Sequence, residues 1–335
     1  MTLRRELLGG ANRVLDKLGV HVLPTSDYQL MRRSFEGPQF VGPDLPEAAR
    51  DILRWDNPGL IDLERRYARH PAAAHTQWQK GNLRSVIDVS RFRGDNHYVH
   101  QTRFNPSEAV YFMTAYYMRD TDRLGLFGKL KEDGLFGAYT ITFHDDDTIS
   151  RDLLDSINQA NMIARVLGRT GGWRVLDIGA GYGRLAHRLA EGIANAHTTC
   201  TDAVPLSTFL SKFYLDFRGV GDRSAVVPLD EVETRLTGQA FDIVTNIHSF
   251  PECPKRAIAW WLDRLDTIAV SKLLIVPNRA DAFLSTEADG RHLDFEHLFV
   301  EHGWTHVHSE PIYAQSQVAQ RCALYPHFKF HVFER

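Results

Sequence analysis

VLDIGAGYGRL, residues 175–185, joins an apolar run to a glycine-rich turn and then to the start of an amphipathic segment. The apolar run predicts a strand over Val175–Ile178, with the acid Asp177 near its end. Glycine allows tight turns with positive φ and lets the backbone approach a ligand closely. A strand, turn and helix in this order bring backbone amides and a helix N-terminus beside a bound nucleotide-like ligand. The residues expected to contact that ligand are Asp177, Gly179, Ala180, Gly181 and Gly183.

The spacing of these residues favours S-adenosylmethionine as the cofactor. Dinucleotide-binding turns read G-x-G-x-x-G and carry a pyrophosphate. Here the glycines alternate as G-x-G-x-G, and Asp177 lies two residues before the first of them. A carboxylate suits the cationic amino-acid end of S-adenosylmethionine and would repel a pyrophosphate. The run DIGAGYG resembles motif I of the class I S-adenosylmethionine-dependent methyltransferases.

Length and composition indicate a globular protein of one large or two ordinary domains. The chain has 335 residues, 43% hydrophobic residues and a formal net charge of −3. It therefore lacks a global basic field that would attract nucleic acid or an anionic membrane, and neither is expected as a partner. The three cysteines are scattered, no segment has the apolar core of a signal peptide, and no apolar run spans a bilayer. These features predict a cytoplasmic protein.

Residues 149–335 alternate between strand-like and helix-like patterns, which predicts an α/β Rossmann-like sheet of mostly parallel strands. The last two strands have no helix between them, so an antiparallel C-terminal edge is expected. This order is the one expected of the class I methyltransferase fold with seven strands. The predicted strands are Val175–Ile178, His197–Thr201, Ala225–Leu229, Phe241–Ile247, Leu273–Pro277, Thr305–His308 and Phe328–Phe333. The predicted helices between them are residues 185–193, Pro205–Phe217, Ala257–Leu265 and Leu293–His302.

Residues 1–148 are expected to form a mostly helical cap or substrate region, preceding the cofactor-binding domain of residues 149–335. Aromatic residues are dense in this region, and prolines and glycines separate its helical stretches. Ser150 is suited to cap a helix over Arg151–Leu167, which would stop at Gly168. The predicted helical stretches of the cap are Leu3–Leu18, Leu60–His70 and Pro106–Arg119.

Ligands of open α/β sheets bind beyond the carboxyl ends of the strands. Asp202, with Ala203 beside it, follows the second predicted strand and is placed to accept hydrogen bonds from ribose hydroxyls. This feature is shared with nicotinamide-binding domains and does not discriminate between cofactors. Leu229 and Asp230 follow the third strand, where an apolar side chain and an acid would flank adenine. A plain surface loop is the alternative for both positions.

The fourth strand ends in Asn246, followed by Ile247, His248 and Ser249, and faces the expected position of the transferred methyl group. An alcohol becomes a better nucleophile when a base takes its proton, and the ordinary pKa of histidine suits that task. His248 is therefore the candidate general base; the alternatives are a histidine hydrogen-bonded in the core and one that only lines the site. The Asn/Asp-Pro-Pro-Tyr/Phe run of enzymes that methylate nucleobase amines is missing, which disfavours a nucleic-acid acceptor.

Two further groups of residues raise the question of a metal ion. His144 precedes three consecutive acids, Asp145 to Asp147, and five histidines lie between His292 and His308. Consecutive acids usually point in different directions, and His292 and His297 do not have the i, i+4 spacing of a helical metal pair. No metal is therefore predicted.

Between about residues 90 and 280 the chain resembles the putative sugar O-methyltransferase family found in natural-product and polysaccharide gene clusters. The resemblance implies methyl transfer to a sugar hydroxyl. It also implies that Arg151 and Asp152 lie near the amino-acid end of the cofactor, and that His248 and Glu252 line the acceptor side. The stretches that carry it are Phe92 to Asn96 (FRGDN) with Tyr98, Ser150 to Asn158 (SRDLLDSIN), the glycine turn, Asn246 to Glu252 (NIHSFPE) and Leu273 to Asn278 (LLIVPN).

The leading hypothesis is thus an S-adenosylmethionine-dependent O-methyltransferase that acts on a sugar or a glycosylated small molecule. A non-sugar acceptor, a non-catalytic S-adenosylmethionine-binding module and a nicotinamide-dependent oxidoreductase are the alternatives. A homo-oligomer is left open by the sequence.

Overall fold

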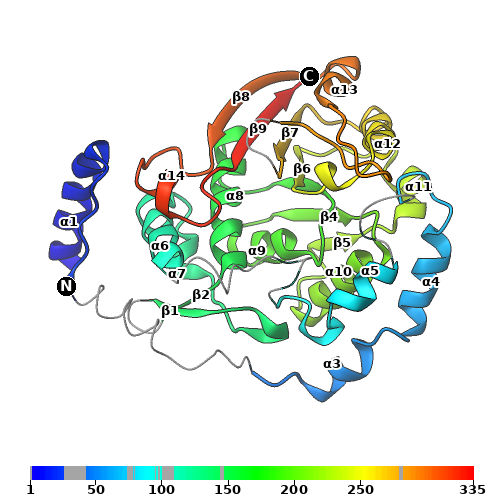
Figure 1. Ribbon diagram of the computed structural model, residues 1–335, viewed down its shortest axis with the longest axis horizontal. Coiled ribbons are helices and arrows are strands. Elements are labelled where there is room, and N and C mark those ends of the chain that lie inside the picture. Colours follow the sequence, from blue (N-terminus) through cyan, green and yellow to red (C-terminus); the bar gives the residue numbers. More distant parts are fainter. Residues whose placement is uncertain are drawn as a thin grey trace. The chain divides into compact units, whose positions relative to one another are not determined.

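The computed structural model describes residues 2–25, 43–73, 78, 80–94, 96, 99, 109–143, 147–278 and 282–335. The chain divides into two compact units. Figure 1 labels their helices and strands. The sheet unit consists of Arg54–Ser85, Gln159–Glu310 and Phe328–Arg335. The hairpin unit consists of Met1–Leu53, Val86–Asn158 and Pro311–His327. The expected boundary between residues 148 and 149 stays a prediction.

The sheet unit contains a seven-stranded sheet in the order β5-β4-β3-β6-β7-β9-β8. The pairs β4–β5, β3–β4, β3–β6 and β6–β7 are parallel, whereas β9 runs antiparallel to β7. This order and the antiparallel edge are those expected of a Rossmann-like class I methyltransferase fold, so the predicted fold class is confirmed. The strands are β3 (Arg174–Ile178), β4 (His197–Thr201), β5 (Ser224–Val226), β6 (Ile243–Ile247), β7 (Lys272–Val276), β8 (Thr305–Pro311) and β9 (Lys329–Glu334).

Helices cover both faces of this sheet because successive strand side chains point to opposite sides. Leu176 packs in one apolar cluster with residues of α12 and α13, while Cys200, the lateral partner of Asp177, packs in a second cluster with α9 and α10. A central parallel strand is buried on both sides, as Val175–Ile178 of β3 are, and in this stretch the acid Asp177 is the exception to the apolar pattern. The helices are α4 (Pro58–Tyr67), α5 (Lys80–Val86), α9 (Arg184–Gly192), α10 (Pro205–Phe217), α11 (Val232–Leu236), α12 (Lys255–Leu265) and α13 (Glu296–Glu301).

Several predicted elements have different bounds in the structure; strand β8, for example, extends to Pro311, whereas the prediction ended at His308. The third strand ends at Val226, and Leu229 instead opens the 3₁₀ helix η4 (Leu229–Glu231) directly after Pro228, which has no backbone N–H for a strand ladder. The fourth strand starts at Ile243 rather than Phe241. The helix expected from Leu293 starts only at Glu296, because Leu293 accepts a backbone hydrogen bond from Ser285 across an extended pair.

The hairpin unit is mostly helical, as predicted for much of this region, but it also contains an antiparallel hairpin that the sequence did not predict. The hairpin pairs β1 (Ile141–Phe143) with β2 (Asp147–Ile149). Residues 106–108 of the predicted third cap helix lie outside the described residues. The helices are α1 (Thr2–Leu15), η1 (Asp16–Leu18), α3 (Glu47–Ile52), η2 (Val89–Arg91), α6 (Ala109–Thr121), α7 (Leu126–Lys129), η3 (Leu135–Gly137) and α14 (Ala319–Cys322).

Helix α8 (Arg151–Leu167), which contributes to both units, has the predicted bounds. The Leu153 N–H donates to Ser150 Oγ over 3.1 Å, so Ser150 caps the helix as expected. Gly168 follows the last helical residue with a φ of 65°, a left-handed conformation that ends helices and favours glycine. Both ends of α8 were therefore readable from the sequence.

A buried cluster of charged side chains connects the stretch Phe92 to Asn96 with the stretch Ser150 to Asn158 within the hairpin unit. The guanidinium of Arg93, which is 0% exposed, donates to Glu132 Oε2 over 2.7 Å and to Asp152 Oδ2 over 3.2 Å. Ser150 Oγ donates to the same Glu132 oxygen over 2.6 Å. The other Glu132 oxygen accepts the backbone N–H of Gly134. Arg93 and Asp152 thus hold the unit together, and a cofactor role for Asp152 stays a prediction.

Replacing Arg93 with methionine should destabilise the protein by about 3–5 kcal/mol, because two buried carboxylates lose their counter-charge. Urea unfolding followed by tryptophan fluorescence measures the loss. The matched control is Arg65→Met, since Arg65 pairs with Asp62 on the surface and is 77% exposed. The loss of this solvent-exposed ion pair should leave the unfolding midpoint almost unchanged. Equal unfolding midpoints for the two variants would contradict the assigned role of the cluster.

Candidate functional site

The glycine turn follows β3 and is shaped by hydrogen bonds to the end of β4. The N–H groups of Gly179 and Ala180 donate to the Thr201 carbonyl over 2.8 and 3.2 Å. Gly179, Gly181 and Gly183 have φ angles of 75°, 59° and 83°, a region that favours glycine. A Cβ on Gly179 would lie 2.1 Å from Ser249 Oγ. The turn therefore needs glycine both for its conformation and for its close approach to the loop after β6.

Asp177 is a buried acid at the end of β3, next to the turn. Its lateral neighbour in the parallel ladder is Thr245 of β6, whose Oγ1–H donates to Asp177 Oδ1 over 2.7 Å. Burial raises the pKa of Asp177 to about 6, although the Thr245 hydrogen bond and the charge of Arg184 oppose the shift. A buried carboxylate with a raised pKa gains most from a ligand that brings a positive charge.

Asp202 follows β4 and ties the turn to the start of α10. Its Oδ2 accepts the Gly181 N–H over 2.9 Å, and its Oδ1 accepts the Val204 N–H over 2.8 Å. Burial raises the pKa of Asp202 to about 7 against these two backbone hydrogen bonds, and the nearby Asp177 charge adds to the rise. The neighbouring Ala203 is buried as well.

Asn246, at the end of β6, joins the loops that bound the site. Its Nδ2 donates to the Ile178 carbonyl over 2.9 Å, and its Oδ1 accepts the Phe250 N–H over 2.9 Å. The side chain is fully buried. Asn246 thus links the end of β3 to η5 (Phe250–Glu252). Contact of its side chain with a cofactor stays a prediction.

His248 has an unusual backbone conformation for a residue with a side chain. Its φ is 65°, and its N–H donates to the Val276 carbonyl of β7 over 2.7 Å. The imidazole lies against the ring of Phe328 with 4.5 Å between ring centroids. A non-glycine residue in this region stores strain of about 1–3 kcal/mol, and such residues gather at functional sites. The strain presents the half-buried imidazole at the carboxyl end of β6.

Glu252 has both carboxylate oxygens hydrogen-bonded to neutral donors from distant segments. Trp78 Nε1–H donates to Oε2 over 2.6 Å, and Asn278 Nδ2 donates to Oε1 over 3.3 Å. Part of the residue reaches solvent, yet burial of the carboxyl group raises its pKa to about 7, and the charge of Asp202 contributes to the rise. A carboxylate with this pKa is able to accept or release a proton near neutral pH.

Three carboxyl groups with raised pKa values thus lie at or after the carboxyl ends of β3, β4 and β6: Asp177, Asp202 and Glu252. They influence one another, since Asp177 raises the pKa of Asp202 and Asp202 raises that of Glu252. Acids arranged in this way favour a cationic ligand and disfavour a pyrophosphate. No group of three or more side chains suited to a metal ion occurs among the described residues, and His144, Asp145 and Asp146 lie outside them.

The residues expected around adenine have partners from the N-terminal segment of the sheet unit. Arg66 donates to both oxygens of Asp230, over 2.7 and 2.8 Å, and to Glu231 over 2.7 Å. The N–H of Leu229, which is buried, donates to the Tyr67 hydroxyl over 2.6 Å, and that hydroxyl lies 3.0 Å from Thr208 Oγ1. Both oxygens of Asp230 are therefore engaged by Arg66 of α4. Contact of Leu229 or Asp230 with adenine stays a prediction.

Arg151 belongs to the hairpin unit, where its partners are Asp155 and Tyr325. Its Nε donates to Asp155 Oδ2 over 3.0 Å, and its guanidinium lies 4.7 Å from the Tyr325 ring centroid. In the sheet unit, the cation that acts on the acid of the glycine turn is Arg184, the first residue of α9. Arg184 also donates to Gln159 Oε1 over 2.9 Å. A cofactor role for Arg151 stays a prediction.

Four residues of this site were not predicted from the sequence: Arg66, Arg184, Thr245 and Asn278. Trp78 is one of the many aromatic residues of the predicted cap, among which the sequence does not select a substrate contact. Thr245 could have been found, because parallel register places it beside Asp177 once β3 and β6 are neighbours. Arg184 stands inside the opening motif. Trp78 and Arg66 had no local signal, since they belong to a segment more than 140 positions away from their partners.

No protein-family model and no curated protein matches the chain. Solved structures with a similar backbone include the [4+2]-cyclase SpnF, at 15% identity and a TM-score of 0.39, over 55% of this chain and 82% of that one. The magnesium protoporphyrin IX methyltransferase ChlM of Synechocystis PCC 6803 is 15% identical, with a TM-score of 0.38, over 55% of this chain and 82% of that one. The mitomycin 7-O-methyltransferase MmcR is 20% identical, with a TM-score of 0.39, over 55% of this chain and 56% of that one. Because these TM-scores lie below 0.5, the assignment of the fold rests on the strand order of this chain.

Among the described helices, none combines the length and the apolar character that a bilayer crossing requires.

Proposed function

We propose that this protein is an S-adenosylmethionine-dependent O-methyltransferase that acts on a hydroxyl group of a sugar or a glycosylated small molecule. The observation that carries the proposal is the glycine turn between Asp177 and Asp202, two buried acids with raised pKa values. The bound cofactor supplies a methyl group on a positively charged sulfur.

The residues of the turn fit this cofactor. Asp177 offers a negative charge near the turn for the ammonium group, and Arg184 offers a positive charge for the carboxylate. Asp202 stands at the end of β4, the usual place for an acid that accepts ribose hydroxyls. A dinucleotide would place two phosphate charges among these carboxylates, which disfavours a nicotinamide-dependent oxidoreductase.

The residues after β6 fit the acceptor side of the reaction. An attacking hydroxyl must lose its proton, and His248 is the proposed acceptor of that proton at an imidazole nitrogen. Glu252, fixed by Trp78 and Asn278, has room to accept a hydrogen bond from a neighbouring hydroxyl of the same substrate, since each carboxylate oxygen has two lone pairs. An indole ring beside a carboxylate suits a sugar, which offers both an apolar ring face and hydroxyl groups. A non-sugar acceptor and a non-catalytic binding module remain the competing proposals.

Calorimetric titration of the full-length protein with S-adenosylhomocysteine, NAD and NADP tests the cofactor class. Micromolar affinity for S-adenosylhomocysteine alone, roughly −8 kcal/mol, is expected. Binding of NAD or NADP instead would contradict the proposal. Methyl transfer from radiolabelled S-adenosylmethionine to a panel of glycosides and matched aglycones then separates a sugar acceptor from a non-sugar acceptor. Affinity with no turnover on any acceptor would favour the binding module.

The affinity for S-adenosylhomocysteine should rise as the pH is raised from 5.5 to 7.5. Asp177, Asp202 and Glu252 have pKa values of about 6, 7 and 7, and a cationic ligand favours their ionised forms. Binding near pH 6 should therefore release protons, which titrations in buffers of different ionisation enthalpy measure. In the free protein the same raised pKa values stabilise the fold at low pH, and this contribution should disappear as the pH rises from about 4 to above 7. An affinity that is flat or falls with pH would contradict this account.

A further inference from the structure

Glu252 is the last residue of η5, and the chain is fixed on both sides of it. The N–H of Thr286 donates to the Cys253 carbonyl over 3.1 Å, and its Oγ1–H donates to the Pro251 carbonyl over 2.8 Å. The two oxygens of the Glu252 carboxylate are held by the indole and amide donors described above. The carboxylate therefore has a fixed position within the sheet unit, four residues after the proposed base.

Glu252 has no cationic partner in the described part of the chain. Both hydrogen bonds to its carboxylate come from neutral groups, and no cation is among the groups that shift its pKa. Burial and the charge of Asp202 raise that pKa to about 7, so the ionised form is disfavoured in the free protein. A ligand that places a positive charge beside this carboxylate therefore gains affinity from it.

The proposed cofactor leaves the charge of Glu252 uncompensated. S-Adenosylmethionine carries a sulfonium, an ammonium and a carboxylate group, so it contributes one net positive charge. In the protein, the cation that acts on the acid of the glycine turn is Arg184. These two positive charges match the two acids beside the turn, Asp177 and Asp202. A further positive charge is therefore needed to match Glu252, and the acceptor is the remaining component of the reaction that can bring it.

The indole of Trp78 is a second feature that suits a cation at this position. Its Nε1–H donates to the carboxylate over 2.6 Å, so the edge of the ring adjoins the Glu252 oxygens. Trp78 and Glu252 are both half-buried, so each still reaches solvent. Indole attracts cations to its face more strongly than the other aromatic side chains do. A protonated amine can thus donate hydrogen bonds to the carboxylate and lie against the aromatic ring.

We propose that the acceptor carries a protonated amino group beside the hydroxyl that is methylated, as an amino sugar does, and that Glu252 and Trp78 bind this group. The inference rests on the proposed methyl transfer and specifies the substituent next to the reacting hydroxyl. An ammonium group has no lone pair with which to attack the methyl carbon. The hydroxyl oxygen therefore forms the new bond to carbon, the bond from carbon to sulfur breaks, and the hydroxyl proton passes to His248.

Calorimetric titration of the full-length protein, saturated with S-adenosylhomocysteine, tests the inference. The probes are methyl glucoside and its monoamino-monodeoxy derivatives, one for each hydroxyl group. At least one amino derivative should bind about 10-fold or more tightly than methyl glucoside, because it adds a charge-assisted hydrogen bond. N-acetylation of that derivative removes the charge and should remove the gain. Mass spectrometry of the product formed with S-adenosylmethionine should show an O-methyl group and an unmodified amine.

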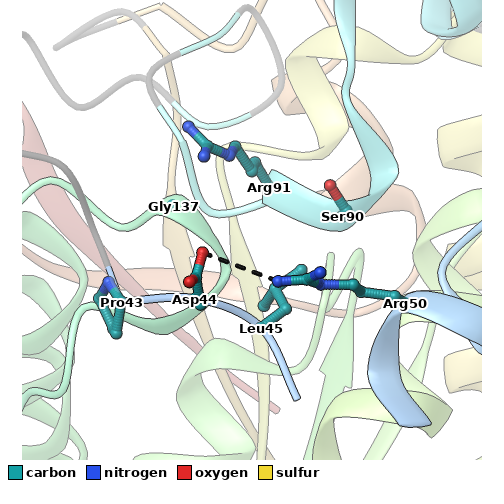
Figure 2. A pocket seen from close by; sticks show the side chains of 7 residues that line it. All are labelled: Pro43, Asp44, Leu45, Arg50, Ser90, Arg91 and Gly137. Atoms are coloured by element: carbon teal, nitrogen blue, oxygen red, sulfur yellow. Dashed lines mark ion pairs between the residues drawn. The ribbon is translucent and has the colours of Figure 1, made fainter. Parts of the chain in front are cut away.

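Glu252→Gln should bring the affinities for the amino derivative and for methyl glucoside to within about threefold of each other, since it removes the charge and little volume. Trp78→Phe keeps an aromatic ring and should keep most of the preference, whereas Trp78→Leu should reduce it several-fold. The matched control is Asp44→Asn in the hairpin unit. The Asp44 carboxylate is 98% exposed and lies 3.7 Å from the guanidinium of Arg50 in a surface pocket (Figure 2), so its loss should leave the preference unchanged.

Amino derivatives that all bind no more tightly than methyl glucoside would overturn the inference, and so would a preference that Glu252→Gln retains or an N-methylated product. If neutral glycosides are methylated and the amino derivatives show no preference, this inference alone fails and the proposed function stands. If S-adenosylhomocysteine does not bind, the proposed function fails and this inference fails with it. Because glutamine has nearly the size of glutamate, the result for Glu252→Gln stands even if a Trp78 variant unfolds.

Discussion

His248→Asn should lower turnover on a hydroxyl acceptor by about 100-fold or more while the affinity for S-adenosylhomocysteine stays within about threefold. Asparagine tolerates the positive φ at this position better than alanine does, so the loss reports the imidazole rather than backbone strain. Its amide does not accept a proton at neutral pH. Single-turnover methyl transfer, measured alongside calorimetry of the same variant, separates the chemical step from binding.

Glu252→Gln provides the comparison for this variant. If His248 accepts the proton, the glutamine variant should mainly weaken acceptor binding and raise KM. Glutamine keeps one accepting oxygen for Trp78 or Asn278, whereas its NH₂ group cannot accept from the other donor. If instead Glu252 accepts it, the larger loss of kcat should belong to Glu252→Gln, and the limb of the pH–rate profile near 7 should disappear in that variant. Turnover by His248→Asn equal to that of the wild type would remove His248 from the proposed role.

Asp177→Asn should reduce the affinity for S-adenosylhomocysteine at least about 100-fold at pH 7.5, equivalent to about 2.7 kcal/mol. Asparagine keeps an oxygen that accepts the hydrogen bond of the Thr245 hydroxyl. The substitution therefore removes the negative charge and preserves this hydrogen bond. The same variant should unfold at a higher urea concentration than the wild type without ligand, by roughly 1–3 kcal/mol at pH 8, because the wild type buries an ionised group whose pKa is raised to about 6.

This pair of opposite effects distinguishes a binding acid from a structural one. Neutralising an acid that supports the fold would destabilise the protein. Neutralising an acid that is kept ionised for a ligand should instead stabilise the protein and weaken its affinity for that ligand. Asp216→Asn is the control, since Asp216 lies in the same unit, is 52% exposed and pairs with Lys212. An Asp177→Asn variant with unchanged affinity would show that the turn does not bind the proposed cofactor through this carboxylate.

Local patterns predicted the elements of the sheet unit well. The bounds of β4, α8 and α10 follow from apolar periodicity and caps that involve only neighbouring residues. Errors occurred where a distant pairing decided the local conformation: Leu293 is extended because it pairs with Ser285, although its sequence is compatible with a helix. The hairpin of β1 and β2 was missed because its strands are only three residues long.

The site shows the same division between local and distant causes. Asp177, Asp202, Asn246 and His248 were predicted because each lies at the carboxyl end of a strand or directly after it. The topology of an open α/β sheet gathers these strand ends at one edge. The hydrogen bond of Trp78 to Glu252 and the ion pair of Arg66 with Asp230 depend on which part of the N-terminal region packs on the sheet unit. Periodicity and spacing contain no information on that choice.

The membership of Arg54–Ser85 in the sheet unit has a consequence for protein engineering. In a chimaera that exchanges residues 1–148 as one block, three hydrogen bonds to the sheet unit would be lost. These are Trp78 to Glu252, Leu229 to Tyr67 and Arg66 to Asp230. Crossovers placed after Leu53 and before Val86 keep all three contacts with their partners. An exchange of the N-terminal region should therefore replace the segments before Arg54 and after Ser85 and keep the native residues Arg54–Ser85 between them.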